Sequence, residues 1–342
     1  MQAILWERID DESKKVLCNL CNHYCRIAPG KYGLCRARKN EDGELTTEVY
    51  GKLISMNADP IEKKPLYHFL PNSYSLSVAT AGCNFRCDFC QNCEISQALF
   101  AGHEIPYRFT APEDIVAAAK REACASISYT YTEPTIFFEY ALDTAKQAVE
   151  AGIANCFVSN GFMTVKAVET IAPYLQAINV DLKCFSEETY RKVIGGRLEP
   201  VLETIRALYA AGIWMELTTL IVPDMNDTEE EIREIARFIA DLDPQIPWHV
   251  SRFFPRYQRN HGHATQPMII QKALEIGQAQ GLKHIYCGNI MLDGQDGTHC
   301  PNCGALVVRR SGYQVQNHLG PEGACPECQT TCAGVWENPV KV

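Results

Sequence analysis

The sequence has no apolar run that approaches the ~20 residues a helix needs to span a bilayer. Its first fifteen residues, MQAILWERIDDESKK, lack the pattern of a secretory signal. The sequence also has fewer positively charged residues than negatively charged ones, with 32 Lys and Arg and 41 Asp and Glu. The resulting net charge of −9 argues against general nucleic-acid binding. These deficits predict a cytoplasmic protein that contacts neither membrane nor nucleic acid.

Cysteine, by contrast, is abundant: the 342 residues include 17 cysteines. Without an export signal these thiols are expected to be reduced, so many of them should bind metal and few should form disulfides. With 46% hydrophobic and 21% charged residues, the composition suits a large core domain with small appendages. Most of the cysteines fall into three groups, one near each end of the chain and one in the middle.

The middle group is in residues 79–96, ATAGCNFRCDFCQNCEIS, where Cys83, Cys87 and Cys90 form C-x3-C-x2-C. Three thiolates on one short loop can each bind one iron of a [4Fe–4S] cube, which leaves the fourth iron open to a small molecule. A zinc knuckle normally brings two C-x2-C pairs together, rather than presenting a C-x3-C-x2-C triplet after a strand. The stronger alternative is a closed cluster, in which four cysteines bind all four irons. Cys93 would allow it, because it extends the run to C-x2-C-x2-C, as in ferredoxins.

The N-terminal group reads CNLCNHYCRIAPGKYGLC, with Cys18, Cys21, Cys25 and Cys35 in eighteen residues. Such a small module needs a metal to fold, and thiolates suit either zinc or a second Fe–S cluster. A redox role and a structural clip both remain open, and we favour the clip. His23 is interpreted as a bystander.

The C-terminal group consists of two C-P-x-C knuckles separated by a short segment. Four thiols form them: Cys300, Cys303, Cys325 and Cys328. This spacing is typical of a zinc ribbon, which predicts a closed zinc site with Cys332 unliganded. We interpret the ribbon as a lid or a docking surface.

Short apolar or β-branched runs alternate with helical patterns through the centre of the chain. The expected strands are residues 74–80, 125–129, 154–159, 176–182, 213–222 and 247–253. Helix starts are predicted from a capping box of Thr110 with Glu113, another of Asp227 with Glu230, and Thr265 followed by Pro267. Six βα units predict an α/β fold, a partial (βα)6 TIM-like barrel with a parallel sheet.

The predicted domains are an N-terminal cysteine-rich module and polar connector at 1–72, the barrel at 73–292, and the zinc-ribbon-like module at 293–342. Active-site residues of such barrels lie at the C-terminal ends of the strands. Polar residues stand at several of those ends: Glu133, Ser159, Asn160, Asp181, Lys183, Thr218, Thr219, His249 and Arg252. Four single cysteines, Cys124, Cys156, Cys184 and Cys287, are expected to be small buried hydrophobes, with Cys184 closest to a cavity.

Residues 79–96 are called the cluster loop below. Together with T-E-P, S-N-G, D-L-K and P-W-H, this loop resembles the pyruvate formate-lyase-activating branch of radical S-adenosylmethionine (SAM) proteins. Within that branch the sequence looks most like the radical SAM enzymes of the AmmeMemoRadiSam system, on the N-terminal CNLCNHYCRI and on GCNFRCDFCQNCEISQ. The resemblance covers about residues 15–290. It implies a [4Fe–4S] cluster whose open iron binds SAM, and Phe89 fits the aromatic preferred between the last two cysteines.

The resemblance also implies roles for residues that could contact SAM. Glu133 matches the acid near the SAM amino group, Asp181 and Lys183 match a D-x-K pair beside SAM, and His249 matches the histidine near its ribose. Ser159 and Asn160 supply further hydrogen-bonding groups. The segment L-T-T-L-I-V-P lacks the Arg that activases often bear on strand five, and Cys93 stands where an aromatic is expected.

These features predict a radical SAM enzyme that cleaves SAM to a 5′-deoxyadenosyl radical and abstracts hydrogen from an unidentified peptide, protein or small molecule. A glycyl-radical-enzyme activase and a non-catalytic Fe–S electron-transfer or scaffold protein are the alternatives. The resemblance implies Memo-type and AMMECR-type partners, and an electron donor such as flavodoxin or ferredoxin.

Overall fold

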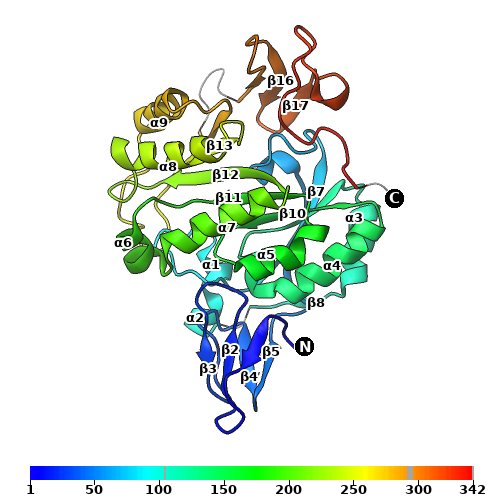
Figure 1. Cartoon of the computed structure of the whole chain (residues 1–342), viewed down its shortest axis with the longest axis vertical. Coiled ribbons are helices and arrows are strands. Elements are labelled where there is room, and N and C mark those ends of the chain that lie inside the picture. The colour runs from blue at the N-terminus through cyan, green and yellow to red at the C-terminus, as the bar shows by residue number, and fades with distance from the viewer. Residues whose placement is uncertain (104, 291–295, 341–342) are drawn as a thin grey trace.

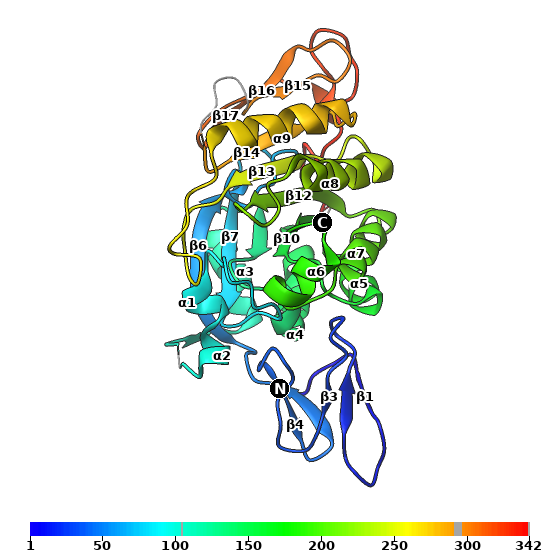
Figure 2. The same ribbon diagram turned by 90° about the vertical axis from the view of Figure 1, so that its left-hand side faces the viewer.

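The computed structural model describes residues 1–103, 105–290 and 296–340. Figures 1 and 2 show a central α/β body with a small β-rich module at each end of the long axis. The N-terminal module lies beside the helices that follow the cluster loop, and the C-terminal module lies at the opposite end. Within the described ranges, no helix is both long and apolar enough to cross a membrane.

The central sheet has nine strands in the order β14-β13-β12-β11-β10-β9-β7-β6-β8. Seven of them run parallel: β7 (Tyr74–Thr80), β9 (Ser126–Tyr129), β10 (Ala154–Ser159), β11 (Ala177–Asp181), β12 (Trp214–Ile221), β13 (Trp248–Arg252) and β14 (Ile285–Gly288). The linear order leaves the sheet open, which confirms the predicted partial barrel. Strand β14 is one more parallel strand than predicted, and its four residues make a weak sequence signal.

Two antiparallel strands complete the sheet beside β7: β6 (Lys52–Pro60) and β8 (Arg108–Phe109). The interpretation of the segment that precedes residue 73 as a polar connector is therefore wrong for β6, which pairs along the length of β7. Most side chains of β6 are half-buried, and the polar Lys52, Ser55 and Asn57 interrupt its sequence, so its pattern lacked the apolar run of a core strand. The predicted domain division stays a prediction, and its boundary at 292–293 lies outside the described residues.

The helices connect successive parallel strands, as right-handed crossovers require. They are α1 (Cys93–Ser96), α2 (Ala98–Ala101), α3 (Pro112–Arg121), α4 (Phe138–Glu150), α5 (Val165–Ile171), α6 (Glu187–Thr189), α7 (Leu198–Ala210), α8 (Glu229–Leu242) and α9 (Pro267–Ala279). Short 3-10 or π turns complete the set: η1 (Ile61–Lys63), η2 (Pro134–Phe137), η3 (Ala172–Tyr174), η4 (Tyr190–Ile194) and η5 (Pro321–Gly323). Their apolar faces and the buried strands form one large core, and a smaller cluster joins Ala154, Cys156 and Ala177 of the sheet to Ile61, Leu66, Phe69 and Leu70.

The predicted helix caps are partly wrong. Helix α3 has Ala111 as its N-cap, because the Thr110 hydroxyl donates to the Arg108 carbonyl instead. Helix α8 is capped by Thr228, whose hydroxyl accepts from the Glu231 N–H; the predicted Asp227 accepts from Asp224 in the preceding turn. Pro267 does open α9, but its N-cap is Gln266.

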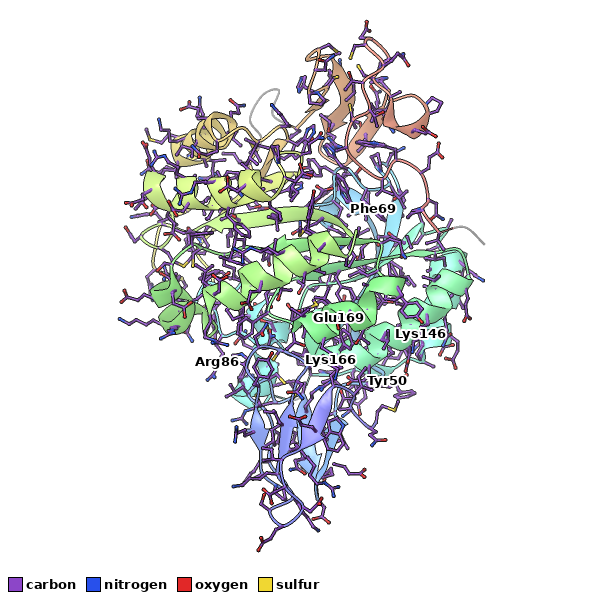
Figure 3. The ribbon with its side chains drawn as sticks, viewed as in Figure 1. Tyr50, Phe69, Arg86, Lys146, Lys166 and Glu169 are labelled. Atoms are coloured by element: carbon purple, nitrogen blue, oxygen red, sulfur yellow. The ribbon has the colours of Figure 1, made fainter. Side chains whose placement is uncertain are left out.

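The two end modules are built from short antiparallel strands. The N-terminal module contains β1 (Trp6–Arg8), β2 (Val16–Cys18) and β3 (Arg26–Ile27), followed by the hairpin β4 (Arg38–Glu41) and β5 (Glu44–Thr47). The C-terminal module contains β15 (Thr298–His299), β16 (Leu306–Ser311) and β17 (Gln314–Asn317). Figure 3 labels Tyr50 at the junction of the first module with helix α4, where its hydroxyl donates to Asp143 at 2.9 Å.

Candidate active site

A cavity of about 300 Å³ opens at the carboxyl ends of the parallel strands. Nine of the residues that the sequence singled out line it together: Cys83, Cys87, Phe89, Cys90, Glu133, Ser159, Asn160, Asp181 and Lys183. They come from the loop after β7 and from the ends of β9, β10 and β11, because parallel strands bring their carboxyl ends to one edge of the sheet. The volume is at the lower end of the range for small-molecule sites.

The three cysteines stand on a loop held by hydrogen bonds. The Phe85 N–H donates to Cys83 Sγ at 3.3 Å, and Asn160 Nδ2 approaches the same sulfur at 3.7 Å. Cys90 Sγ lies 3.1 Å from Ser96 Oγ. Burial raises the pKa of Cys87 to about 12 and that of Cys83 well above its usual value. Positive charge from a metal centre would stabilise the thiolate forms.

Asp181 and Lys183 face the cavity as a pair. Strand alternation places them on the same side, with Lys183 Nζ 3.1 Å from Asp181 Oδ2. Burial acts to lower the pKa of Lys183, but Asp181 and the Cys87 thiol raise it, so the net pKa lies above the usual value. The cavity therefore carries a permanent ammonium group beside the cysteine loop.

Glu133 is buried and organises the ends of two strands. Its Oε1 accepts from the Thr135 N–H at 3.0 Å, the Thr135 hydroxyl at 2.6 Å and the Ser159 hydroxyl at 2.8 Å. Its Oε2 accepts from the Asn160 N–H at 2.8 Å. Burial raises the pKa of Glu133, against these hydrogen bonds, which lower it. Oε2 keeps acceptor capacity toward the cavity.

The sequence reasoning missed some residues of the cavity wall, among them Thr130, Tyr131 and Ser251. Asn84 lies just behind the wall, and Asn160 Nδ2 donates to its Oδ1 at 2.7 Å. Thr218 was noticed only as a polar residue on strand five. Within the described part of the chain its buried hydroxyl has no hydrogen-bond partner, although it lines the cavity. A buried polar atom of this kind suits a bound ligand.

His249 does not line this cavity. It is buried in a separate polar cluster, where its Nε2 lies 2.6 Å from Glu216 Oε2. Glu216 also accepts from the backbone N–H groups of Tyr67 and His68. The geometry therefore gives no support to contact between His249 and a SAM ribose.

Cys93 is the first residue of α1 and is absent from the cavity lining. Its Sγ lies 3.6 Å from the Glu94 carboxylate. The four single cysteines, Cys124, Cys156, Cys184 and Cys287, are all buried. Cys184 also lies outside the lining; its thiol points to the Ser186 carbonyl at 3.7 Å.

The N-terminal cysteines are free thiols: Cys18 ends β2, Cys21 and Cys25 lie between β2 and β3, and Cys35 lies between β3 and β4. Burial raises the pKa of Cys21 well above its usual value, and the neighbouring thiols of the group raise it further. Arg38, itself buried, donates to Cys18 Sγ at 3.5 Å and forms an ion pair with Glu139 of α4.

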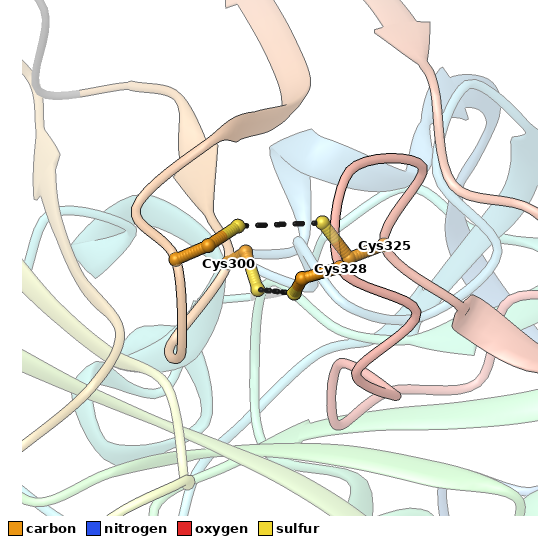
Figure 4. A group of neighbouring side chains, drawn as sticks. Cys300, Cys325 and Cys328 are labelled. Carbon is orange, nitrogen blue, oxygen red and sulfur yellow. Dashed lines mark hydrogen bonds between the residues drawn. The ribbon is translucent and has the colours of Figure 1, made fainter.

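The C-terminal cysteines form a tight cluster, shown in Figure 4. Cys300 Sγ lies 3.6 Å from Cys328 Sγ, and Cys303 Sγ lies 3.7 Å from Cys325 Sγ. All four sulfurs lie within 4.8 Å of one another. Thiolates at the corners of a tetrahedral zinc site are separated by roughly 3.8 Å, so this donor set fits a metal ion. Cys332 is buried in the same apolar cluster.

Comparison with known proteins settles the family. The sequence pattern of the radical SAM superfamily matches residues 77–239, which include the cluster loop and the strands that line the cavity. This chain belongs to the radical SAM superfamily. An uncharacterized protein of Methanocaldococcus jannaschii is 42% identical over 310 residues, which cover 90% of this chain and 91% of that protein.

Relatives with named activities match over shorter stretches. The isethionate sulfite-lyase activating enzyme of Oleidesulfovibrio alaskensis is 26% identical over 122 residues, covering 34% of this chain and 40% of that enzyme. Among solved structures, a radical SAM methyltransferase from Sphaerobacter thermophilus has 15% identity and a TM-score of 0.50, covering 64% of this chain and 66% of that one. The structural likeness shows a shared fold.

Proposed function

We propose that the protein reductively cleaves SAM at a [4Fe–4S] cluster held by Cys83, Cys87 and Cys90. The observation that carries the proposal is that these three thiols line one cavity with the Asp181–Lys183 pair and the Glu133 carboxylate. Three thiol ligands leave one iron of a cube open. Cys93 lies outside the lining, which supports an open cluster over a closed four-cysteine one.

The other groups of the cavity fit SAM in kind. SAM presents an ammonium, a carboxylate and ribose hydroxyls. Lys183 supplies a cation for a carboxylate, Glu133 Oε2 supplies an acceptor for an ammonium, and the unpaired Thr218 hydroxyl suits a further polar group. Contacts to charged groups of this kind are each worth about 1.5–3 kcal/mol.

The cluster with SAM would supply a 5′-deoxyadenosyl radical, and the chain supplies binding, orientation and exclusion of water. Lys183 and Asp181 hold charge beside Cys87 from the end of β11. Glu133 fixes the Ser159–Asn160 turn, and Asn160 in turn holds Asn84 of the cluster loop. Lys63 and Tyr131 also line the cavity and would face a substrate from which the radical takes a hydrogen atom.

An activase of a glycyl-radical enzyme is the second candidate. It is supported by the relative named as an isethionate sulfite-lyase activating enzyme, whose matched region is 40% of its length. In that case the substrate is a protein that presents a glycine to the cavity. Either reaction needs a one-electron donor such as flavodoxin or ferredoxin, and Memo-type and AMMECR-type proteins are proposed partners on the resemblance alone.

We further propose that Cys300, Cys303, Cys325 and Cys328 bind zinc as a structural site. The four sulfurs form a closed set with no open position for substrate. No described residue of their module, which lies at one end of the long axis (Figure 1), lines the cavity, which does not favour the interpretation of the ribbon as a lid over it.

The experiment for SAM cleavage uses the full chain with its clusters reconstituted under anaerobic conditions. With dithionite and SAM, it should release 5′-deoxyadenosine and methionine in equal amounts, slowly when no substrate is present. The control is the Cys87→Ala variant, which should release neither. If wild-type protein with its full iron and sulfide content leaves SAM intact, the enzyme proposal fails and the electron-transfer alternative is supported.

A further inference from the structure

The four N-terminal thiols are neighbours, but they are too far apart for a zinc ion. The Cys18 N–H donates to the Cys25 carbonyl at 2.9 Å, and the N–H of Leu34, the residue before Cys35, donates to Cys25 Sγ at 3.4 Å. All four residues are described by the structure, yet no three of their sulfurs lie within 4.8 Å of one another. A tetrahedral zinc site requires separations of roughly 3.8 Å.

The other two cysteine groups of this chain provide the comparison. The four C-terminal sulfurs meet the zinc spacing, with separations of 3.6 and 3.7 Å. Cys83, Cys87 and Cys90 do not: like the N-terminal group, they form no trio within 4.8 Å. Thiolates around an Fe–S cube must stand farther apart, because four irons, rather than one ion, lie between them. The N-terminal group therefore shares with the cluster loop a spacing wider than that of the C-terminal set.

The surroundings of the N-terminal thiols also suit a cluster. The buried Arg38 guanidinium donates to Cys18 Sγ at 3.5 Å, and the Leu34 N–H donates to Cys25 Sγ at 3.4 Å. Hydrogen bonds and positive charge at the sulfurs raise the reduction potential of a cluster.

A short packed path joins this group to the cluster loop. Between Cys21 and Cys25, His23 places its Nε2 2.8 Å from the carbonyl oxygen of Asn84, the residue after Cys83. The ring of Phe162 packs between His23, at 4.9 Å, and Phe85, at 5.0 Å between ring centroids. The path thus runs from one cysteine loop to the other through one hydrogen bond or through two ring contacts.

We propose that Cys18, Cys21, Cys25 and Cys35 hold a second [4Fe–4S] cluster, which passes electrons to the cluster at Cys83, Cys87 and Cys90. A reduced carrier protein of the flavodoxin or ferredoxin class loses one electron to the N-terminal cluster. That electron moves on to the cavity cluster and is consumed when the S–C5′ bond of SAM breaks. The relay rests on the proposed function, whereas the identity of the N-terminal metal does not.

The metal is tested with Cys83→Ala/Cys87→Ala/Cys90→Ala, which leaves the N-terminal module intact. After anaerobic reconstitution of the full chain, this variant should retain about four irons and four sulfides, against about eight of each in wild type. Its reduced EPR signal should not respond to SAM. If this variant contains no iron and only the C-terminal zinc, the proposal is overturned. A second zinc ion per chain would overturn it as well.

The relay is tested by EPR and by a comparison of flavodoxin with dithionite as the electron donor. In fully reduced wild type, two neighbouring clusters should broaden each other's signals by spin coupling. The comparison spectra come from the triple variant and from Cys18→Ser/Cys21→Ser/Cys25→Ser/Cys35→Ser. A wild-type spectrum equal to their sum would overturn the relay.

Should the quadruple variant not fold, His23→Leu replaces it, because it keeps all ligands. Reduced flavodoxin should then reduce the cavity cluster more slowly than in wild type, while dithionite reduces it equally well. Equal rates with flavodoxin would contradict the relay. Because iron content and cluster reduction do not depend on SAM cleavage, a failure of the proposed function would be visible separately.

Discussion

Nε2 of His23 lies 2.8 Å from the carbonyl oxygen of Asn84, so two cysteine loops that are 61 residues apart meet at one hydrogen bond. Burial lowers the pKa of His23, which keeps the imidazole neutral at pH 7 with its proton on Nε2 toward the carbonyl. The N-terminal module is thereby fastened to the loop that carries the cavity cysteines.

Replacing His23 with Leu should lower the free energy of unfolding by about 1–3 kcal/mol, because the Asn84 carbonyl loses its partner in a buried place. Chemical denaturation of the reconstituted protein measures this change. The matched control is His261→Leu at an exposed position, which should change stability by less than about 0.5 kcal/mol. Equal effects of the two substitutions would show that the hydrogen bond between His23 and Asn84 does not stabilise the folded protein.

Lys183→Met should weaken SAM binding about 10- to 100-fold, because a charge-assisted contact to the SAM carboxylate is worth roughly 1.5–3 kcal/mol. Titration of SAM into the reduced protein, followed by EPR, gives the dissociation constant. Lys192→Met serves as the control, since Lys192 is exposed and pairs with Glu188 at the surface. Unchanged SAM affinity in Lys183→Met would remove Lys183 from the proposed site.

Acid should weaken the contact between the barrel and the C-terminal module. His68 is buried, with Nδ1 2.7 Å from the Ala333 carbonyl and Nε2 2.6 Å from the Tyr286 hydroxyl. Burial, with repulsion from neighbouring positive groups, lowers its pKa well below the usual value. Burial also lowers the pKa of the adjacent His284 to about 4.

Both histidines are neutral in the folded protein, and in the unfolded chain their pKa is about 6.5. At pH values between about 6.5 and the lower folded pKa values, the unfolded state therefore binds more protons than the folded state. Stability is complete above about pH 6.5 and should fall toward pH 4 by about 1.4 kcal/mol per histidine per pH unit. Denaturation curves at several pH values measure this slope. His284→Leu should flatten the slope and His263→Leu, at an exposed site, should not. The same slope in His284→Leu and wild type would contradict the assignment.

Zinc removal should unfold the C-terminal module without emptying the cavity site, because the cavity cysteines lie on the loop after β7 in the central body and no described residue of that module lines the cavity. Cys303→Ser should lose zinc, increase proteolysis after residue 295, and keep its iron. Zinc and iron analysis of the same sample checks both halves. Cys332→Ser is the control, because Cys332 lies outside the four-sulfur set; loss of zinc in that variant would revise the ligand set.

The sequence predicted the fold and much of the cavity because both depend on local patterns. Apart from the exposed Tyr74 and the half-buried Val158, the strands at 74–80 and 154–159 are buried, and the cysteine loop has fixed spacing. The polar strand ends at Glu133, Ser159 and Lys183 follow from strand position alone. Strand β6 was missed because it is half-exposed and pairs with β7, which no local pattern reveals.

His249 shows why residue roles were harder to predict. It occupies a predicted strand, but its Nε2 is taken by Glu216 from β12, a contact 33 residues away in sequence. His23 shows the reverse, because a residue interpreted as a bystander meets the cluster loop only after the chain folds. Both cases concern long-range contacts of polar side chains, which a single sequence does not encode by position.

The most direct test of an open cluster at Cys83, Cys87 and Cys90 is the EPR spectrum of reduced protein with and without SAM. The variant that carries only the cavity cluster, Cys18→Ser/Cys21→Ser/Cys25→Ser/Cys35→Ser, and the same variant with Cys93→Ala should both respond to SAM. A SAM-induced change only after Cys93 is removed would mean that Cys93 closes the cluster, and the proposed SAM cleavage would be contradicted.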